Sequence, residues 1–442
     1  MAELMAPWVT ASVVVPLAAA AMARLASASR ARTIGLIGCG TSLILSIEAV
    51  RELVAAGGTA MSKPWVPALF SASPLGAVTM ALFAILALVT LISAPRRDSD
   101  SVSGILTLTA GALIAYGADS LIVFLAGWTV ALIPFATRLR SELAISTGFL
   151  ALGTILQAAG APEFYTFSFL VLAAVVRTGL FPFHRTVVSR FETEPLGSTG
   201  LLMNTHLGIF LVVRFVIPMF PAPAQAVVPF LCALGLFTAI YAALLGMVER
   251  EPRRLLALVF LSQASAIFAG FVTSRPEGTM GGLIQWIVLG ITSTVMVSIF
   301  RSIEARIRQP WATDGLLGLA AQMPRLAVFF AVTAFALVGL PGTLGFPGED
   351  LLIHGVLSAH PVIGMLLPAA IAMNAYHLYR LFSRLFLGAP ITAWAAAPDA
   401  LPRERWTLAV CIVILVWGGL MPSQVVALRS TAGELIATLT TN

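Results

Sequence analysis

The stretch Ala173–Arg190, AAVVRTGLFPFHRTVVSR, places an arginine, a Gly-x-x-Pro element and a histidine within a strongly apolar part of the chain. A lone arginine is costly inside a membrane. A helix interrupted by Gly179 and Pro182 also frees backbone amides that lipid cannot satisfy. Such a break is tolerated where it is buried in protein or lines a cavity. The stretch therefore predicts a broken membrane helix at a functional position.

The composition around this stretch is that of a membrane protein. Of the 442 residues, 59% are hydrophobic and 10% are charged, and the mean hydropathy is +0.95, whereas soluble domains carry about 25% charged residues. Cys39, Cys232 and Cys411 have no paired spacing, which predicts neither a disulfide framework nor a metal site. The net charge of +6 comes from basic residues scattered singly between apolar runs. We interpret them as topology signals and expect no nucleic-acid partner.

Apolar runs of about 17–25 residues predict an all-α polytopic protein with fourteen membrane spans. The spans are expected near 6–24, 33–50, 75–94, 103–118, 120–137, 143–160, 165–182, 196–216, 222–248, 253–273, 279–301, 325–358, 361–386 and 405–423. The twelfth run is too long for one span and contains GLPGTLGFPGED, so it predicts a second broken helix, interrupted near Gly342–Pro347. Matched broken helices in two halves are typical of an ion or substrate route.

The basic residues support this division of the chain. Sorted by alternate loops, 20 of the 26 lysines and arginines fall on one side, and only Arg51, Lys63, Arg275 and Arg429 fall on the other. Arg177 and Arg214 lie within or at the end of spans. By the positive-inside rule this bias predicts that both termini face outward across a bacterial inner membrane.

Three ionisable residues inside spans are the leading candidates for an ion path. Arg177 lies near the middle of the seventh span, His206 lies in the middle of the eighth, and Glu349 follows the break of the twelfth. Arginine keeps its proton and acts as a fixed charge. A histidine titrates near neutral pH, and a carboxyl at loosened backbone can exchange protons. These residues predict a chain of polar groups that carries protons.

Secondary candidates are polar groups with an equally good structural explanation. Ser262 and Gln263 are able to hold water or to pack helices together. Asp350 points to a different face from Glu349, His354 follows one turn later, and His377 is expected near the membrane interface. The sequence contains no motif of a soluble enzyme, and no metal or cofactor site is predicted.

Four longer segments resemble one family. They are RTGLFPFH at 177–184, LVVRFVIPMFP at 211–221, EREPRRLLALVFLSQ at 249–263 and GLPGTLGFPGEDLL at 339–352. With them the chain resembles the antiporter-like membrane subunits of respiratory complex I, especially the bacterial M chain. The same superfamily includes subunits of multisubunit cation/proton antiporters, membrane hydrogenases and inorganic-carbon uptake complexes.

The resemblance implies an architecture for the whole chain. Two inverted five-helix repeats would comprise spans 4–8 and 9–13. The chain then divides into a three-helix segment (1–94), two repeats (103–216 and 222–386) and a C-terminal helix and tail (405–442). Arg177 falls on the seventh-helix lysine of the family's proton path, His206 on the eighth-helix lysine and Glu349 on the acid of the broken twelfth helix.

The chain also departs from the family pattern. Thr129 follows Trp128 where the family has a glutamate, an arginine replaces the seventh-helix lysine, and Leu289 stands near the position of the eleventh-helix histidine. These departures indicate a divergent member.

The sequence leaves three functions open. The first is a proton-conducting subunit of a complex-I-like or hydrogenase-like machine, without an active site of its own and with other subunits, including a peripheral catalytic one, as partners. The second is the proton channel of an inorganic-carbon uptake complex. The third is a non-conducting membrane scaffold.

Overall fold

The computed structural model describes residues 8–55, 69–71, 73–95, 100–138, 141–307, 315–390 and 397–441. The described residues form helices and one isolated bridge between Phe70 and Ala118, without a strand. Five of the basic residues used above (Lys63, Arg96, Arg97, Arg140 and Arg308) lie outside these ranges.

The described residues of the first half of the chain form eleven α-helices. They are α1 (Trp8–Leu25), α2 (Ala28–Ala55), α3 (Pro74–Ser93), α4 (Val102–Gly117), α5 (Leu121–Leu132), α6 (Ser141–Ala158), α7 (Glu163–Thr178), α8 (His184–Thr193), α9 (Leu196–Asn204), α10 (Leu207–Leu211) and α11 (Ile217–Met219). A 3-10 turn (Ile133–Arg138) follows α5, and a π-helical turn (Val212–Val216) joins α10 to α11.

The second half contains nine further helices among the described residues. They are α12 (Pro221–Val248), α13 (Pro252–Phe271), α14 (Pro276–Ile307), α15 (Pro324–Leu337), α16 (Gly345–Ala359), α17 (Pro361–Gly364), α18 (Leu367–Phe386), α19 (Pro402–Leu420) and α20 (Pro422–Thr441). Leu319–Ala321 form a short 3-10 turn before α15.

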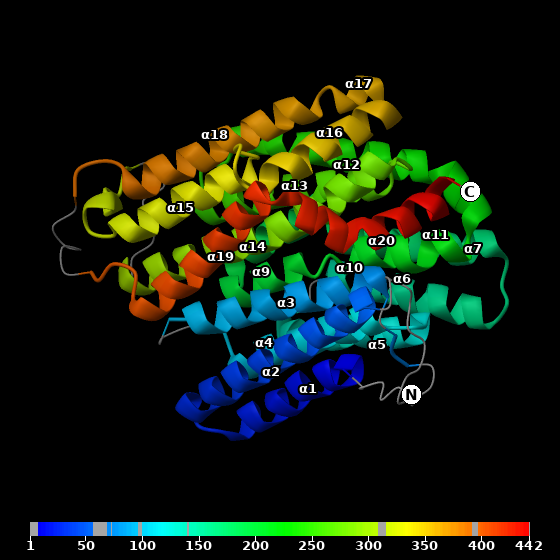
Figure 1. The fold of residues 1–442 in the computed structure, drawn as a ribbon, viewed down its shortest axis with the longest axis horizontal. Helices are drawn as coiled ribbons and strands as arrows, with labels where there is room; N and C mark the ends of the chain where they lie inside the picture. Colours follow the sequence, from blue (N-terminus) through cyan, green and yellow to red (C-terminus); the bar gives the residue numbers. More distant parts are fainter. Residues whose placement is uncertain are drawn as a thin grey trace.

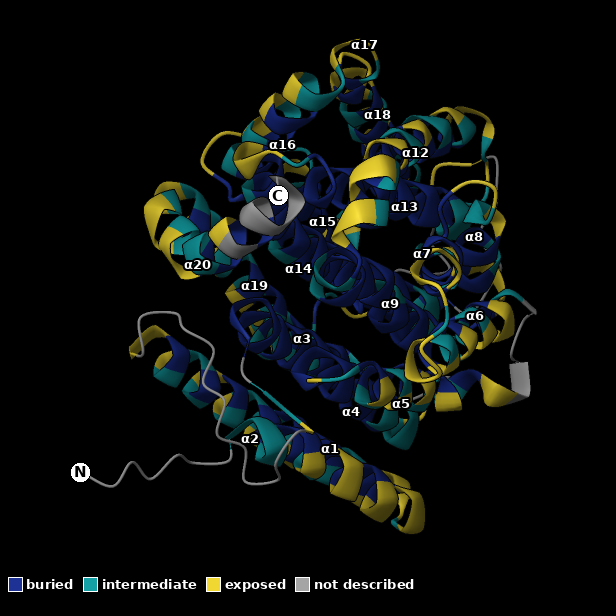
Figure 2. Cartoon of the chain, turned by 90° about the vertical axis from the view of Figure 1, so that its right-hand side faces the viewer, coloured by how far each residue is buried: buried dark blue, intermediate teal, exposed yellow. Residues whose placement is uncertain are grey.

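The helices lie side by side in one elongated bundle (Figure 1). Within the described ranges, eight helices are long and apolar enough to cross a membrane, and four shorter apolar helices lie among them. Seen along the bundle, α13, α14 and α9 occupy the buried centre, while α1 and α2 lie at the edge with one face exposed (Figure 2). The chain is therefore an all-helical, multi-pass membrane protein. Cys39, Cys232 and Cys411 are free and buried.

Basic residues from distant parts of the sequence meet at one end of this bundle. Arg253 at the start of α13 pairs with Glu304 of α14 at 2.6 Å. Arg306 at the end of α14 pairs with Glu404 of α19 at 2.6 Å. Arg380 of α18 donates to the carbonyl of Glu249 at 2.9 Å. The turn from α1 to α2 and the connection from α18 to α19 lie at this same end (Figure 1). We call it the arginine end.

The two expected breaks are present, and one lies earlier than predicted. The first separates α7 from α8 at residues 179–183, as expected. The second was expected near Gly342–Pro347 but covers 338–344, and Pro347 lies in the first turn of α16. A proline fits there because the first-turn N–H groups of a helix have no intrahelical acceptor.

Two further interruptions differ from the sequence prediction. The eighth span was expected to be continuous, but α9 ends at Asn204 and α10 begins at Leu207. The segment expected as a C-terminal tail forms α20, which is bent by 86° from α19. Helix α20 packs against α14, so tertiary contacts support it although its own sequence is only moderately apolar.

Candidate functional site

The break after α7 is built by Gly179. This residue has φ +76°, and the N–H groups of Gly179 and Leu180 bond back to the carbonyls of Val176 and Val175. A glycine favours this left-handed conformation because it has no Cβ. The freed N–H of Phe181 donates to the hydroxyl of Thr238 on α12 at 3.0 Å. The break thus leaves Arg177 in the last turn of α7, inside the bundle.

The break between α9 and α10 is built by His206 itself. His206 has φ +43°, an uncommon backbone conformation for a residue other than glycine. The carbonyl of Thr205 accepts a hydrogen bond from the hydroxyl of Tyr116 on α4. Asn204, just before the break, donates to Thr294 at 3.2 Å and accepts from Ser293 at 2.9 Å, both on α14. The imidazole is therefore held at a helix interruption in the buried centre.

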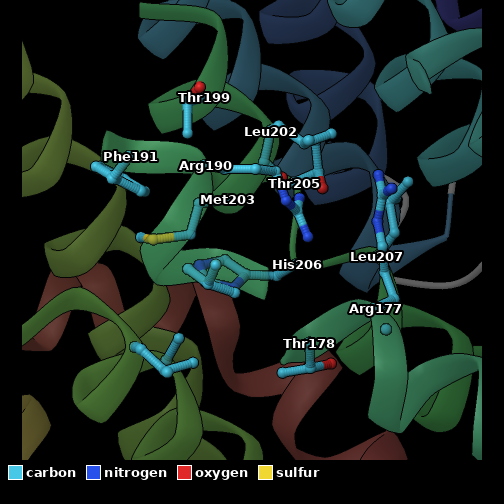
Figure 3. A pocket seen from close by; sticks show the side chains of 14 residues that line it. Arg177, Thr178, Arg190, Phe191, Thr199, Leu202, Met203, Thr205, His206 and Leu207 are labelled. Carbon is cyan, nitrogen blue, oxygen red and sulfur yellow. Dashed lines mark hydrogen bonds between the residues drawn. The ribbon is translucent and has the colours of Figure 1, made fainter. Parts of the chain in front are cut away.

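Arg177 and His206 line the same cavity, together with Arg190 of α8. The cavity has a volume of about 30 Å³. Its remaining polar lining consists of threonines (Thr178, Thr199 and Thr205), and its lining contains no carboxylate. Figure 3 shows the three ionisable side chains approaching it from α7, α8 and the α9–α10 break. We call it the arginine cavity.

The guanidinium of Arg177 is buried without a counter-charge in this cavity. Arg177 is 8% exposed, and its Nη1 and Nη2 atoms have no hydrogen-bond partner among the described residues. Its Cζ lies 4.9 Å from the ring centroid of Trp128 on α5, a cation–π contact. Thr129, the neighbour of Trp128, lies on the exposed face of α5, and its hydroxyl bonds to Leu125 of the same helix. The indole, rather than position 129, therefore faces the cation.

Glu349 occupies a second buried site in the first turns of α16. It is 7% exposed, and its Oε1 atom has no hydrogen-bond partner within the described residues. Gln263 of α13 lies close enough to interact with this carboxyl. Gly339, with φ +67°, makes room for it, because a Cβ there would lie 2.4 Å from Oε2 of Glu349. We call these three residues the glutamate site.

Polar side chains continue from the glutamate site toward the arginine end. Ser262 of α13 donates to the carbonyl of Ala239 at 2.8 Å, and Asn374 of α18 donates to Ser262 at 2.8 Å. His377, one turn after Asn374, is fully buried and its Nε2 lies 2.8 Å from the carbonyl of Ala243. Helix α18 turns this imidazole toward α12, one turn before Arg380 at the arginine end. Ser262, Gln263 and His377 thus belong to one buried polar line.

Asp350 and His354 do not join this line. Their side chains are 58% and 68% exposed and lie 3.6 Å apart on the outer face of α16. Because Glu349 faces the core, the next residue on the helix points outward. The structure therefore brings Glu349, Gln263 and His377 into the interior and leaves Asp350, His354 and Thr129 on the surface of the chain.

An aromatic ring of α14 packs against His206. The imidazole of His206 packs edge-on against Trp286 of α14, with ring centroids 5.2 Å apart. Trp286 in turn packs against Phe271 of α13 at 5.7 Å. The preceding residue, Gln285, donates to the carbonyl of Gly345 at the α15–α16 break at 3.4 Å. Helix α14 therefore contacts both interruptions with adjacent residues.

A wider cavity opens at the arginine end, beside α8. It has a volume of about 520 Å³ and its charged lining residues are Glu142, Arg185, Glu192, Glu249 and Arg254. Thr186 also lines it, and Arg190 of the arginine cavity donates to the carbonyl and hydroxyl of Thr186 at 3.2 and 3.4 Å. The Thr186–Arg190 contact therefore connects this vestibule to the arginine cavity.

An ion-pair cluster marks the rim of the vestibule. Arg254 pairs with Glu249 at 2.8 Å and with Glu192 at 3.0 Å. Partial burial by itself raises the pKa of Glu249. Hydrogen bonds from the N–H groups of Glu251 and Arg250 and from the Arg254 guanidinium outweigh this effect and hold the pKa below its usual value. Glu249 is therefore ionised at neutral pH and fixes the position of Arg254.

Sequence reasoning missed Arg190, Trp286 and Asn374. Arg190 was assigned to topology because a basic residue after a span is common on the inner side. Its spacing of four residues from Thr186 would have placed both on one face of a helix. Trp286 and Asn374 carry no signal of their own, because an apolar or amide residue in a span is usually a packing residue.

Comparisons with known proteins show the family of the chain. The profile of the NADH:quinone oxidoreductase/Mrp antiporter transmembrane family matches residues 115–373. A NADH-quinone oxidoreductase subunit M from Rickettsia conorii is 25% identical over 270 residues, which is 60% of this chain and 54% of the relative. A NADH-quinone oxidoreductase subunit 13 from Thermus thermophilus is 31% identical over 231 residues, 50% of this chain and 48% of the relative. The chain thus spans about half the length of the curated relatives it matches.

Solved structures show the same fold over nearly the whole chain. A chain of respiratory complex I from Thermus thermophilus matches with a TM-score of 0.83 and 23% identity, covering 98% of this chain and 99% of that chain. A chain of the Mrp complex from Dietzia sp. DQ12-45-1b matches with a TM-score of 0.82 and 16% identity. The match covers 98% of this chain and 97% of that chain. On the match to residues 115–373, which include both broken helices and both buried sites, the chain belongs to the NADH:quinone oxidoreductase/Mrp antiporter transmembrane family.

Proposed function

We propose that this protein is a proton-conducting, antiporter-like subunit of a larger energy-coupling membrane complex. The observation that carries the proposal is the position of Arg177, His206 and Glu349. Each is buried in the interior, and each lies at or beside an interruption of a helix. Ionisable residues inside a membrane protein mark ion pathways by default. The relatives named above belong to complexes of this kind, and we extend that role to this chain.

We assign different roles to the three residues. His206 and Glu349 carry the proton, because an imidazole and a buried carboxyl both change charge reversibly. Arg177 sets the electrostatic field around His206. Protons enter from the vestibule past the Thr186–Arg190 contact, and transfer from His206 toward Glu349 passes the Trp286 ring that packs against His206. Ser262, Gln263 and His377 extend the path from Glu349 toward the arginine end.

We propose the same fourteen-span architecture for the chain in its membrane. The broken pairs α7–α8 and α15–α16 each count as one interrupted span, and α9–α11 counts as another. Helices α4 to α11 (103–216) and α12 to α18 (222–386) then form two inverted repeats, with 1–94 and 405–442 outside them. One observation supports this proposal: the broken pair is fourth in each set. The arginine end faces the cytoplasm of a bacterial cell, and both termini face outward.

We propose that other membrane subunits and a peripheral catalytic subunit complete the machine. The chain then supplies translocation and no active site of its own. Thr129, on the exposed face of α5, is placed to meet a neighbouring subunit rather than Arg177.

The decisive experiment compares interior and surface variants of the same residue types. His206→Ala and Glu349→Gln are expected to abolish most proton uptake by proteoliposomes of the intact complex, normalised to assembled protein. Removing one ionisable member interrupts the relay, while the amide at 349 preserves packing. His354→Ala and Asp350→Asn are the matched controls, because both side chains are exposed on α16. Parental uptake by assembled His206→Ala and Glu349→Gln variants would refute the path.

One observation favours a second candidate, a non-conducting scaffold. Trp286 packs directly against His206, with ring centroids 5.2 Å apart, on the imidazole that would have to pass its proton on. A scaffold predicts that Trp286→Ala lowers assembly without changing coupled activity per assembled complex. The conducting subunit predicts a changed rate per assembled complex, because this ring contacts the imidazole that carries the proton.

A further inference from the structure

We propose that the arginine cavity is a binding site for a small monovalent inorganic anion, with chloride as the representative ligand. The anion would take the place of the acid that the cavity lacks. This inference builds on the cavity of the proposed proton path, but its test is binding, which does not depend on conduction.

The charge of Arg177 requires an acceptor. Arg190 also lines the cavity, its guanidinium is close enough to repel that of Arg177, and none of the lining residues carries a carboxylate. Arg190 and Glu194, one turn apart at the end of α8, have interactions of their own, so the unmet donors are those of Arg177. The hydroxyl of Tyr116 interacts electrostatically with Arg177, but it donates its hydrogen bond to the carbonyl of Thr205.

The hydrogen-bond inventory points the same way. Nη1 and Nη2 of Arg177 are buried without a partner in the described part of the chain, and a guanidinium only donates. Nε2 of His206, which lines the same cavity, is also buried without a partner. A buried, unpaired charge is strongly unfavourable. A water molecule would accept hydrogen bonds from the arginine but would not neutralise its positive charge. An anion accepts the same hydrogen bonds and also neutralises the charge.

The space available selects a small ligand. The volume of about 30 Å³ compares with the ~10–15 Å³ that one water requires. It therefore admits one small anion or about two waters, and it is too small for a phosphate or sulfate group without rearrangement. In Figure 3 the Arg190 guanidinium lies between Arg177 and His206, so the three nitrogen-bearing groups surround one small space.

The test is equilibrium binding of radioactive chloride to the purified full-length chain in nanodiscs of neutral lipid at constant ionic strength, with gluconate as the replacing anion. We expect saturable binding that bromide displaces and sulfate does not. Arg177→Gln is expected to weaken it by at least about tenfold, because one charged partner is lost. Arg177→Lys should retain most of the affinity. Arg214→Gln is the matched control, because Arg214 pairs with Asp119 at 3.5 Å outside the cavity.

Each outcome decides the inference. Absence of saturable chloride binding by the folded parent would show that the cavity holds only water and would overturn it. Equal affinity of parent and a folded Arg177→Gln variant would also overturn it. If Arg177→Gln fails to fold, Arg190→Gln provides the same comparison. If the parent binds chloride and the His206→Ala complex keeps parental proton uptake, the anion site is supported and the proposed path is refuted. If the parent binds no chloride and the His206→Ala complex loses proton uptake, the path is supported and the anion site is refuted.

Discussion

At the scale of single residues, the carboxyl of Glu349 depends on a neighbour without a side chain. Gly339 and Gly342 both have positive φ values, +67° and +90°, in the same break. A Cβ at 339 would lie 2.4 Å from Oε2 of Glu349, whereas a Cβ at 342 meets nothing within 4 Å. Both glycines therefore adopt a left-handed backbone conformation, but only at Gly339 would a side chain collide with the Glu349 carboxyl.

Alanine substitutions separate these two effects. Gly342→Ala is expected to lower the free energy of unfolding by about 1–2 kcal/mol, the cost of a left-handed L-residue, and to keep proton uptake. Gly339→Ala should have the same backbone cost and should also displace the Glu349 carboxyl, so this variant is expected to lose proton uptake as well. Denaturant unfolding and proteoliposome uptake measure the two quantities. Equal uptake by both variants would show that the position of the carboxyl is not critical.

At the scale of the helix, two aspartates cap two helix starts in different environments. Asp100 accepts from the N–H groups of Gly197 and Ser198 at 2.9 Å, in the first turn of α9, and pairs with Arg301 of α14 at 3.5 Å. The side chains of this pair are 2% and 4% exposed. Asp399 accepts from the first turn of α15 and pairs with Arg325, whose side chain is 56% exposed.

Removing each cap should have a different cost. Asp100→Ala is expected to destabilise the protein by about 3–5 kcal/mol, because it leaves the Arg301 charge buried without this partner. Asp399→Ala should cost only about 1 kcal/mol, the usual value of a helix cap, because Arg325 remains hydrated. Urea or guanidinium unfolding of the purified variants gives both values. A smaller loss for Asp100→Ala than for Asp399→Ala would contradict the assignment of α9 as a helix anchored by a buried pair.

At the scale of the whole molecule, the proposed topology assigns each connection to a side of the membrane. Leu25 ends α1, ahead of the turn into α2 that lies at the arginine end, and Arg250 lies between α12 and α13, where its carbonyl accepts from Arg384; both are exposed. Ala55 ends α2, and Glu277 lies in the first turn of α14, after α13; both are also exposed. The three native cysteines are buried, so labelling of engineered cysteines has little background.

Cysteine labelling in intact cells therefore tests the orientation. We expect an impermeant thiol reagent to modify Ala55→Cys and Glu277→Cys directly, and Leu25→Cys and Arg250→Cys only after permeabilisation. The positive-inside rule gives this direction. The reversed pattern would invert the proposed orientation, and a mixed pattern within either pair would show that the number of spans between them is wrong.

The sequence by itself determined the helical membrane class, the family and the existence of two broken helices, the first at 179–183 and the second expected near Gly342–Pro347, a few residues after its position at 338–344. Each of these rests on local chemistry: apolar length, basic residues between spans, and glycine with proline at a break. It also selected Arg177, His206 and Glu349, because an ionisable group in an apolar run stands out against its neighbours. Their role remains a proposal.

Only the tertiary structure decided what those residues meet. It showed that Arg190 shares a cavity with Arg177, that Trp128 rather than Thr129 faces the cation, and that Trp286 packs against His206. It also showed the interruption at His206 and the bend before α20. These features depend on contacts between helices that are distant in sequence, and such contacts leave no periodic pattern within either partner.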